Sequence, residues 1–410
     1  MGSHTIFYKM MFVLNSFVII LWISSVEGLS RGFSNKEEVF KTVSQLVISS
    51  GYPIELHRAV TSDGYILQLH RIPSGRRTVR KTGPSVKGKK VVLIGHGLLG
   101  SSGDFILMGP GKSIAYFLAD EGYDVWLANF RGNIYTSHEN YTRADPSFWE
   151  YSFHEHGTLD LPACIDKVLN VTGLKKLLYV GYSMGTTTGF IMLSERPEYN
   201  DKLLSYVALA PAIYLTNIKS FVQWSLKDFP ILEFLRSLGM LALDINRETL
   251  YLLVQTWCSQ REVRFNVCMR VAYRFVGNDE EQYDPDMMPL AIARAQPASF
   301  RQLEHFGKIA LTDEFTAWED GLFGSVRAYN LDNVKTRVTL MYGENDQLTE
   351  KKQIYRLARK LNSTGVLEAI QPIGDWFKLN HLDVVFAKDV GTIVSQHILK
   401  YIVYIFSKNV

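Results

Sequence analysis

The chain has 410 residues, of which 47% are hydrophobic and 12% are aromatic, and its formal net charge is +3 at pH 7. This length and composition suffice for one large domain or two ordinary ones with a sizeable core. The small net charge gives no reason to expect nucleic acid as a partner, and the few cysteines lack the spacing of a metal site.

The first 28 residues have the parts and the length of a secretory signal peptide. Lys9 precedes an apolar stretch from Met10 to Ile23, and small residues follow near Gly28. An uncleaved anchor is the alternative, but Asn15 and its neighbour interrupt a run that is already short for a bilayer span. We therefore expect an exported chain, secreted or lysosomal, with no transmembrane anchor after signal cleavage.

Cysteines and glycosylation sequons agree with export. Cys258 and Cys268 would close a short loop in an oxidising compartment, whereas Cys164 lies in a helical apolar context and is expected to be a buried free thiol. Sequons for N-glycosylation begin at Asn140, Asn170 and Asn362.

Strands alternate with helices in the first part of the chain. A β-hairpin is predicted over 57–61 and 65–71, around a Ser-Asp-Gly turn. Buried strands are predicted at 90–94, 123–127, 177–180 and 203–210, with helices at 114–121, 154–169 and 186–193 between them.

This alternation stops at Pro211 and returns at Arg337. Residues 212–330 have helical periodicity and no convincing buried strand, and they are followed by strands at 337–342 and 366–373 and helices at 349–361 and 389–406. Such a pattern predicts a mostly parallel central sheet flanked by helices, formed by 29–211 and 331–410. Residues 212–330 are then a helical cap or lid over the carboxyl ends of the strands, where open α/β sheets bind ligands.

The cap has many apolar residues for one thin helical layer. Simple packing onto the sheet domain would explain any single one of them. For the group we favour an acyl pocket or a lid that meets a lipid surface. The residues are Phe221, Trp224, Phe229, Ile231, Leu232, Phe234, Leu235, Leu238, Met240 and Leu241.

A G-x-S-x-G pentapeptide, Gly181 to Gly185, joins the strand at 177–180 to the helix at 186–193. Strand, tight turn and helix are the setting of the nucleophile elbow of α/β-hydrolases, in which the serine hydroxyl stands at a helix N-terminus. A glycine-rich turn without function is the alternative, and the flanking strand and helix argue against it. Ser183 is therefore the predicted nucleophile of an ester-cleaving enzyme.

A catalytic serine needs a histidine as base and a carboxylate that orients the histidine. In α/β-hydrolases the acid and then the histidine follow the serine along the chain. His381 follows the strand at 366–373 and is the candidate base. Glu344 and Asp346 share the loop after the strand at 337–342, and the order alone does not separate them.

The oxyanion hole needs two main-chain N–H groups aimed at the developing negative charge. Met184, directly after the nucleophile, should supply one of them. Leu98, in the glycine-containing loop after the strand at 90–94, is the expected second donor. A glycine-rich turn without function is the alternative for this loop. That alternative is weak, because the loop, the nucleophile, the acid and the base follow one another in the correct order.

These motifs together resemble the acid lipase family of α/β-hydrolases, which includes gastric lipase, lysosomal acid lipase and many insect lipases. The resemblance runs from about Glu38 to the last helix. Its matching stretches are Gly51-Tyr52-Pro53, Thr61-Ser62-Asp63-Gly64-Tyr65-Ile66-Leu67, His96-Gly97-Leu98-Leu99, Gly122-Tyr123-Asp124-Val125-Trp126-Leu127 with Arg131-Gly132-Asn133, the stretch from Tyr179 to Thr187, and Asn380-His381-Leu382-Asp383.

The resemblance implies that Asp346 is the acid, beside Ser183 and His381, and that the cysteine pair of the cap is a disulfide. It implies a serine-dependent lipase that hydrolyses triacylglycerols or sterol esters at a lipid–water interface and needs no cofactor. The elbow departs from the family's usual form, with Tyr182 and Met184 where histidine and glutamine are common. Main-chain donation from Met184 survives this change.

The rival interpretations are a carboxylesterase or acyltransferase for smaller esters and a catalytically inactive lipid-binding homologue. The motifs do not define the preferred acyl chain, the pH optimum, the position of the lid or the oligomeric state. The cap matches the family least well, so acyl preference does not carry over to this chain.

Overall fold

The structure is a computed structural model, and it describes residues 36–76, 90–223, 231–258, 260–374 and 376–408. The expected signal peptide, and Trp224 and Phe229 of the cap, lie outside these residues. In the described part of the chain, no helix has the length and apolar character needed to cross a membrane.

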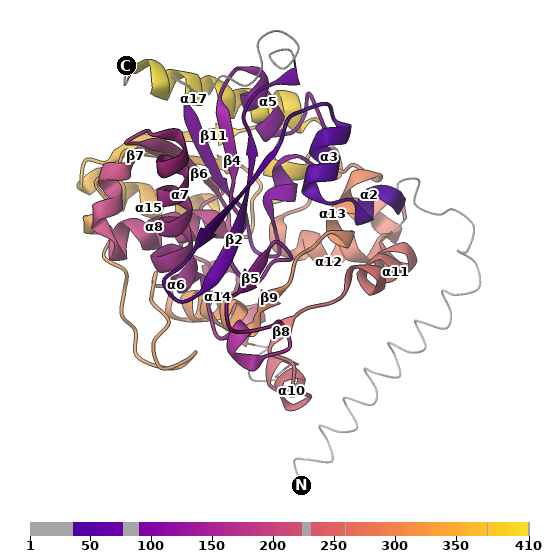
Figure 1. Ribbon diagram of the computed structural model, residues 1–410. Coiled ribbons are helices and arrows are strands. Elements are labelled where there is room, and N and C mark those ends of the chain that lie inside the picture. Colours follow the sequence, from indigo (N-terminus) through magenta and orange to yellow (C-terminus); the bar gives the residue numbers. More distant parts are fainter. Residues whose placement is uncertain (1–35, 77–89, 224–230, 259, 375, 409–410) are drawn as a thin grey trace, which may run out of the picture.

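A nine-stranded, mostly parallel sheet forms the centre of the molecule (Figure 1). The strands are in the order β1-β2-β4-β3-β6-β7-β10-β11, and β5 pairs with β2; pairing is parallel from β4 to β11 and antiparallel among β1, β2, β4 and β5. Their bounds are β1 Glu55–Val60, β2 Tyr65–Ile72, β3 Val91–Gly95, β4 Asp124–Leu127, β5 Thr136–His138, β6 Leu177–Tyr182, β7 Leu203–Leu209, β10 Val338–Gly343 and β11 Leu367–Ile373.

Both faces of the sheet are covered, which is why its central strands are continuous apolar runs rather than alternating ones. In β3, Leu93 packs into the core on one face and Val92 and Ile94 pack into the core on the other. The first core is covered by α7 (Leu161–Thr172), α8 (Met184–Glu195) and α15 (Lys351–Ser363), and the second by α3 (Val43–Ser49), α5 (Ile114–Asp120) and α17 (Gln396–Lys408). This arrangement confirms the predicted α/β-hydrolase fold.

Shorter helical segments connect these elements. They are α2 Lys36–Phe40, η1 Ser102–Phe105, η2 Pro146–Trp149, α6 Phe153–Glu155, η3 His156–Asp160, η4 Pro197–Lys202, η8 Leu331–Asn333, α16 Asp383–Phe386 and η9 Gly391–Ser395. Segments η3 and η9 are π-helical, so the helices predicted at 154–169 and 389–406 each contain an irregular turn. The helices α2 and α3 were not predicted.

The segment after β7 is largely helical, as expected, and lies across one end of the sheet (Figure 1). It contains η5 Thr216–Ile218, α9 Lys219–Gln223, α10 Ile231–Ser237, α11 Arg247–Trp257, η7 Val263–Phe265, α12 Val267–Val276, α13 Met287–Ala293 and α14 Phe300–Thr312. It also contains two buried or half-buried strands, β8 (Ala242–Leu243) and β9 (Ala298–Ser299), which pair antiparallel. The expectation of no strand was wrong here, because two residues are too few to produce a period-two pattern.

The cysteines lie as the sequence predicts. Cys258 at the end of α11 and Cys268 in α12 form a disulfide, and Cys164 is a buried free thiol. The disulfide therefore joins the end of α11 to α12.

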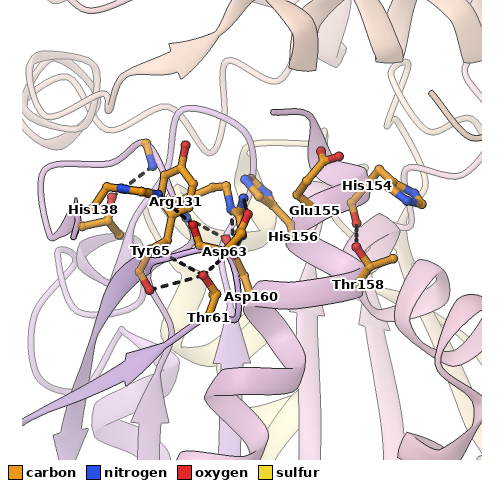
Figure 2. A network of polar contacts seen from close by, with 12 residues as sticks. Thr61, Asp63, Tyr65, Arg131, His138, His154, Glu155, His156, Thr158 and Asp160 are labelled. Carbon is orange, nitrogen blue, oxygen red and sulfur yellow. Dashed lines mark hydrogen bonds and ion pairs between the residues drawn. The ribbon is translucent and has the colours of Figure 1, made fainter. Parts of the chain in front are cut away.

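A buried arginine fastens the loop after β4 to two other parts of the fold (Figure 2). Nε and Nη2 of Arg131 both donate to Oδ1 of Asp160 in η3, and its Nη1 and Nη2 donate to the two carboxylate oxygens of Asp63 in the hairpin turn, with donor–acceptor distances of 2.6 to 3.1 Å. Its guanidinium also lies over the ring of Tyr65, 4.0 Å from the centroid. The network ties the loop after β4 to η3 and to the hairpin turn.

Candidate active site

Ser183 occupies a sharp turn between β6 and α8. Its φ is 51° and its ψ is −117°, a conformation that is strained for a residue with a side chain and that is found in nucleophile elbows. A Cβ on Gly181 would lie 2.6 Å from the carbonyl oxygen of Gly185, and one on Gly185 would collide with the backbone of Gly95. Glycine is therefore required at both positions, and the predicted strand–turn–helix context is present.

The structure brings Ser183, His381 and Asp346 together. The Oγ of Ser183 lies 2.8 Å from Nε2 of His381, and Nδ1 of His381 lies 2.7 Å from Oδ2 of Asp346. Ser183 is 8% exposed and His381 is 4% exposed, so the contacts are shielded from water. The three residues come from the ends of β6, β10 and β11 at one edge of the sheet.

Asp346 is held in place by its own loop. Its Oδ1 accepts hydrogen bonds from the N–H groups of Leu348 and Thr349, and its Oδ2 accepts one from the hydroxyl of Thr349. Burial acts to raise the pKa of Asp346, but the adjacent His381 and these hydrogen bonds outweigh burial and keep the pKa below its ordinary value. Glu344 instead forms an exposed ion pair with Lys351.

The loop after β3 lies directly against the nucleophile, because β3 and β6 are neighbours and Gly95 pairs with Gly181. A Cβ on Gly97 would lie 3.2 Å from the Cβ of Ser183, so glycine permits this approach. In the described part of the chain, the main-chain N–H groups of Leu98 and Met184 donate to no other group. These are the two N–H groups that the sequence predicts for the oxyanion hole.

Comparison with known proteins places the chain in a family. A model of the partial alpha/beta-hydrolase lipase region matches residues 43–109, and a model of the alpha/beta hydrolase fold matches residues 90–262. Lipase 3 of Drosophila melanogaster is 35% identical over 365 residues, which cover 85% of this chain and 90% of that protein. Gastric triacylglycerol lipase of Bos taurus is 33% identical over 374 residues, which cover 88% of this chain and 91% of that protein. The chain belongs to the α/β-hydrolase lipases.

Solved structures agree with the fold of this lipase family at much lower identity. A membrane phospholipase A described as a bacterial virulence factor has 14% identity and a TM-score of 0.50, and the match covers 96% of this chain and 98% of that one. A protein of Sulfolobus solfataricus has 13% identity and a TM-score of 0.52, with 86% and 99% covered. At this identity the likeness shows the fold alone.

Sequence reasoning placed His96 in the loop after β3 of this lipase-family chain but gave it no role, and the structure shows that it holds this loop. Its Nδ1 lies 2.8 Å from the carbonyl oxygen of Gly97, and its Nε2 lies 3.1 Å from the N–H of Phe130. Because a carbonyl can only accept and an N–H can only donate, the proton of the neutral ring is on Nδ1. Burial lowers the pKa of His96 to about 4, so the ring is neutral at physiological pH.

The segment 212–330 also contacts the loop after β3 and the residue that follows Ser183. The N–H of Gln296 donates to the carbonyl oxygen of Leu99 at 2.8 Å, and Leu99 itself has a φ of 58°. The amide nitrogen of Gln302 in α14 lies 3.5 Å from Sδ of Met184. These contacts join residues more than a hundred positions apart, and no local pattern predicts them.

Within the described ranges, no group of three or more histidine, cysteine, aspartate or glutamate side chains is placed to hold a metal ion.

Proposed function

We propose that the chain is a serine-dependent lipase that hydrolyses neutral-lipid esters, triacylglycerols or sterol esters, with Ser183 as nucleophile, His381 as base and Asp346 as acid. The observation that carries the proposal is the continuous contact from Ser183 Oγ through His381 to the Asp346 carboxylate, at 2.8 and 2.7 Å. A base within this distance can take the hydroxyl proton as the oxygen attacks.

In the first half of the reaction, Ser183 Oγ bonds to the ester carbonyl carbon while its proton passes to Nε2 of His381. Asp346, ionised because its pKa is low, stabilises the imidazolium that forms. The negative charge on the carbonyl oxygen is received by the N–H groups of Leu98 and Met184. The tetrahedral intermediate then collapses, its bond to the alcohol oxygen breaks, and the alcohol leaves with the proton from His381.

In the second half, water replaces the alcohol. His381 takes a proton from the water as its oxygen attacks the acyl-enzyme carbonyl, and the same N–H groups receive the charge again. The bond to Ser183 breaks, the fatty acid is released, and the proton returns to Ser183 Oγ. No cofactor takes part in either half.

Two observations support a lipid substrate at a lipid–water interface. Relatives that cover most of this chain include gastric triacylglycerol lipases. The segment 212–330 exposes many large apolar side chains, and such surfaces are typical of lipid or protein contact. The exposed side chains are Phe221, Phe234, Leu238, Ile245, Leu252, Leu253, Val267, Val271, Phe323 and Val326.

We further infer the division into a signal peptide at 1–28, a core at 29–211 and 331–410, and a cap at 212–330, in a protein that is secreted or lysosomal. The disulfide between Cys258 and Cys268 supports an oxidising compartment. The proposed glycosylation sites are all solvent-exposed; they are Asn140, Asn170 and Asn362.

The test compares wild type with Ser183→Ala on emulsified long-chain triglyceride, a sterol ester and a soluble short-chain ester. We expect wild type to hydrolyse the emulsion and to react with a fluorophosphonate probe, and Ser183→Ala to do neither while it unfolds at the same temperature. Turnover by Ser183→Ala would overturn the assignment of the nucleophile. Activity confined to the short-chain ester would favour a carboxylesterase, and a wild type without any labelling would favour an inactive lipid-binding protein.

A further inference from the structure

Tyr182, the residue before the nucleophile, contacts both loops that complete the site. Its buried hydroxyl donates a hydrogen bond to the main-chain carbonyl oxygen of His381 at 3.0 Å. Its ring lies alongside the imidazole, with centroids 5.6 Å apart and planes 29° apart. A Cβ on Gly97 would lie 3.2 Å from Cε1 of Tyr182, so the same ring packs against the oxyanion loop.

His381 is thus fixed through its main chain as well as through its imidazole. Its N–H donates to the carbonyl oxygen of Val276, the last residue of α12, at 3.1 Å, and its carbonyl accepts from Tyr182. Both main-chain groups are bonded to elements outside the loop that carries His381. Since proton transfer depends on placement within a fraction of an ångström, these bonds control how well Nε2 meets Ser183 Oγ.

We propose that Tyr182 is a positioning residue, whose hydroxyl fixes the main chain of His381 so that Nε2 stays within hydrogen-bond reach of Ser183 Oγ. This proposal rests on the proposed triad and explains an elbow in which tyrosine stands where the family commonly has histidine. Tyr182 touches neither substrate nor the reacting atoms in this role.

The surroundings of Tyr182 keep its hydroxyl protonated, so that it can donate a hydrogen bond. Burial raises the pKa of Tyr182 well above its ordinary value, and the nearby carboxylates of Asp104, Asp346 and Asp383 act in the same direction. The hydroxyl therefore carries its proton at every pH at which a carboxylate-assisted triad operates.

The alternative is that Tyr182 serves only the packing of the core. Tyr65 provides a matched control, because its buried hydroxyl also donates to a main-chain carbonyl, that of Phe148, at 2.6 Å, without contacting the triad. Loss of this hydroxyl should lower stability without altering the alignment of His381.

The experiment measures kcat and KM on a soluble short-chain ester for wild type, Tyr182→Phe and Tyr65→Phe, with Ser183→Ala as the blank for background hydrolysis and labelling. Rates are expressed per site titrated with a fluorophosphonate, so that unfolded protein does not count, and thermal unfolding is recorded beside them. For Tyr182→Phe we expect kcat to fall about three- to tenfold, equivalent to about 0.7–1.4 kcal/mol, with KM nearly unchanged. The rate of fluorophosphonate labelling should fall by the same factor, and Tyr65→Phe should keep the wild-type kcat.

A second substitution separates the donor from the ring. With 4-aminophenylalanine at position 182, an N–H donor is restored, and we expect kcat to recover most of the loss. An unchanged kcat and labelling rate in Tyr182→Phe would overturn the proposal, as would equal loss in the phenylalanine and aminophenylalanine proteins. Absence of activity in wild type would instead refute the proposed triad itself, so the two failures are distinguishable.

Discussion

A buried carboxyl next to the active-site loop should make the protein less stable as pH rises. Asp383, the first residue of α16, is 5% exposed, and its Oδ2 accepts a hydrogen bond from the N–H of Asn380 at 2.7 Å. Burial, together with the neighbouring Asp279, raises the pKa of Asp383 from its ordinary value of 3.8 to about 8.

The sign of the effect follows from proton uptake. Between about pH 4 and pH 8 the folded protein keeps a proton on Asp383 that the unfolded chain has lost, so raising the pH favours the unfolded state. The free energy of unfolding should fall by about 1.4 kcal/mol per pH unit through this group, which amounts to roughly 4 kcal/mol between pH 4 and pH 7.

Substitution Asp383→Asn removes this dependence without removing the hydrogen bond. The amide oxygen can still accept from Asn380, and the amide N–H₂ can donate toward Asp279, whose Oδ2 has no hydrogen-bond partner in the described part of the chain. The free energy of unfolding of the variant should lie within about 1 kcal/mol of the wild-type value near pH 4. At pH 7 it should exceed the wild-type value by several kcal/mol.

Urea unfolding followed by circular dichroism from pH 4 to pH 7.5 checks this. Asp201→Asn, at an exposed position, is the control. Its free energy of unfolding should change with pH in the same way as that of wild type. Burial also raises the pKa of Asp104, to about 7. Its effect on the pH dependence of stability is the same in wild type and in Asp383→Asn, so it cancels when the two free energies of unfolding are subtracted. If the free energy of unfolding falls equally steeply with pH in Asp383→Asn and in wild type, the reasoning is refuted.

Two further predictions concern stability. Arg131→Met leaves the buried Asp160 without its cation and should lower the free energy of unfolding by about 3–5 kcal/mol; an unchanged urea midpoint would contradict this. Cys268→Ser opens a loop whose ends are 10 residues apart and should lower the free energy of unfolding by about 2–3 kcal/mol, so the variant should unfold like wild type treated with reductant. A variant as stable as the oxidised wild type would show that the loop is restrained by other contacts.

The sheet and the order of the site residues could be predicted because each depends on a local pattern. Apolar runs marked the central strands, and the turn at Ser183 needs glycines that are visible in the sequence. The loop after β10 was located in the same way, but its two carboxylates looked alike. Asp346 points into the site and Glu344 into solvent, a difference of orientation that composition does not carry.

The unpredicted part consists of contacts between distant segments. The bond from Tyr182 to His381 joins residues 199 positions apart, and the N–H of Gln296 reaches Leu99 from the cap. His96 has an ordinary place after a strand, and only the fold shows that both ring nitrogens are used. Such contacts leave no periodic pattern or fixed spacing in the sequence, because the packing of whole helices, strands and loops brings the two residues together.

The hydrogen bond between Ser183 and His381 spans 198 positions, with the entire segment 212–330 between them. During synthesis the serine emerges long before the imidazole does, and closure of so long a loop is slow compared with local folding. If Ser183 and His381 act as proposed, a chain interrupted anywhere before position 381 would carry the nucleophile without its base. On the proposed roles, ester cleavage would therefore have to wait until synthesis has passed position 381 and the segment 212–330 has folded out of the way of this contact.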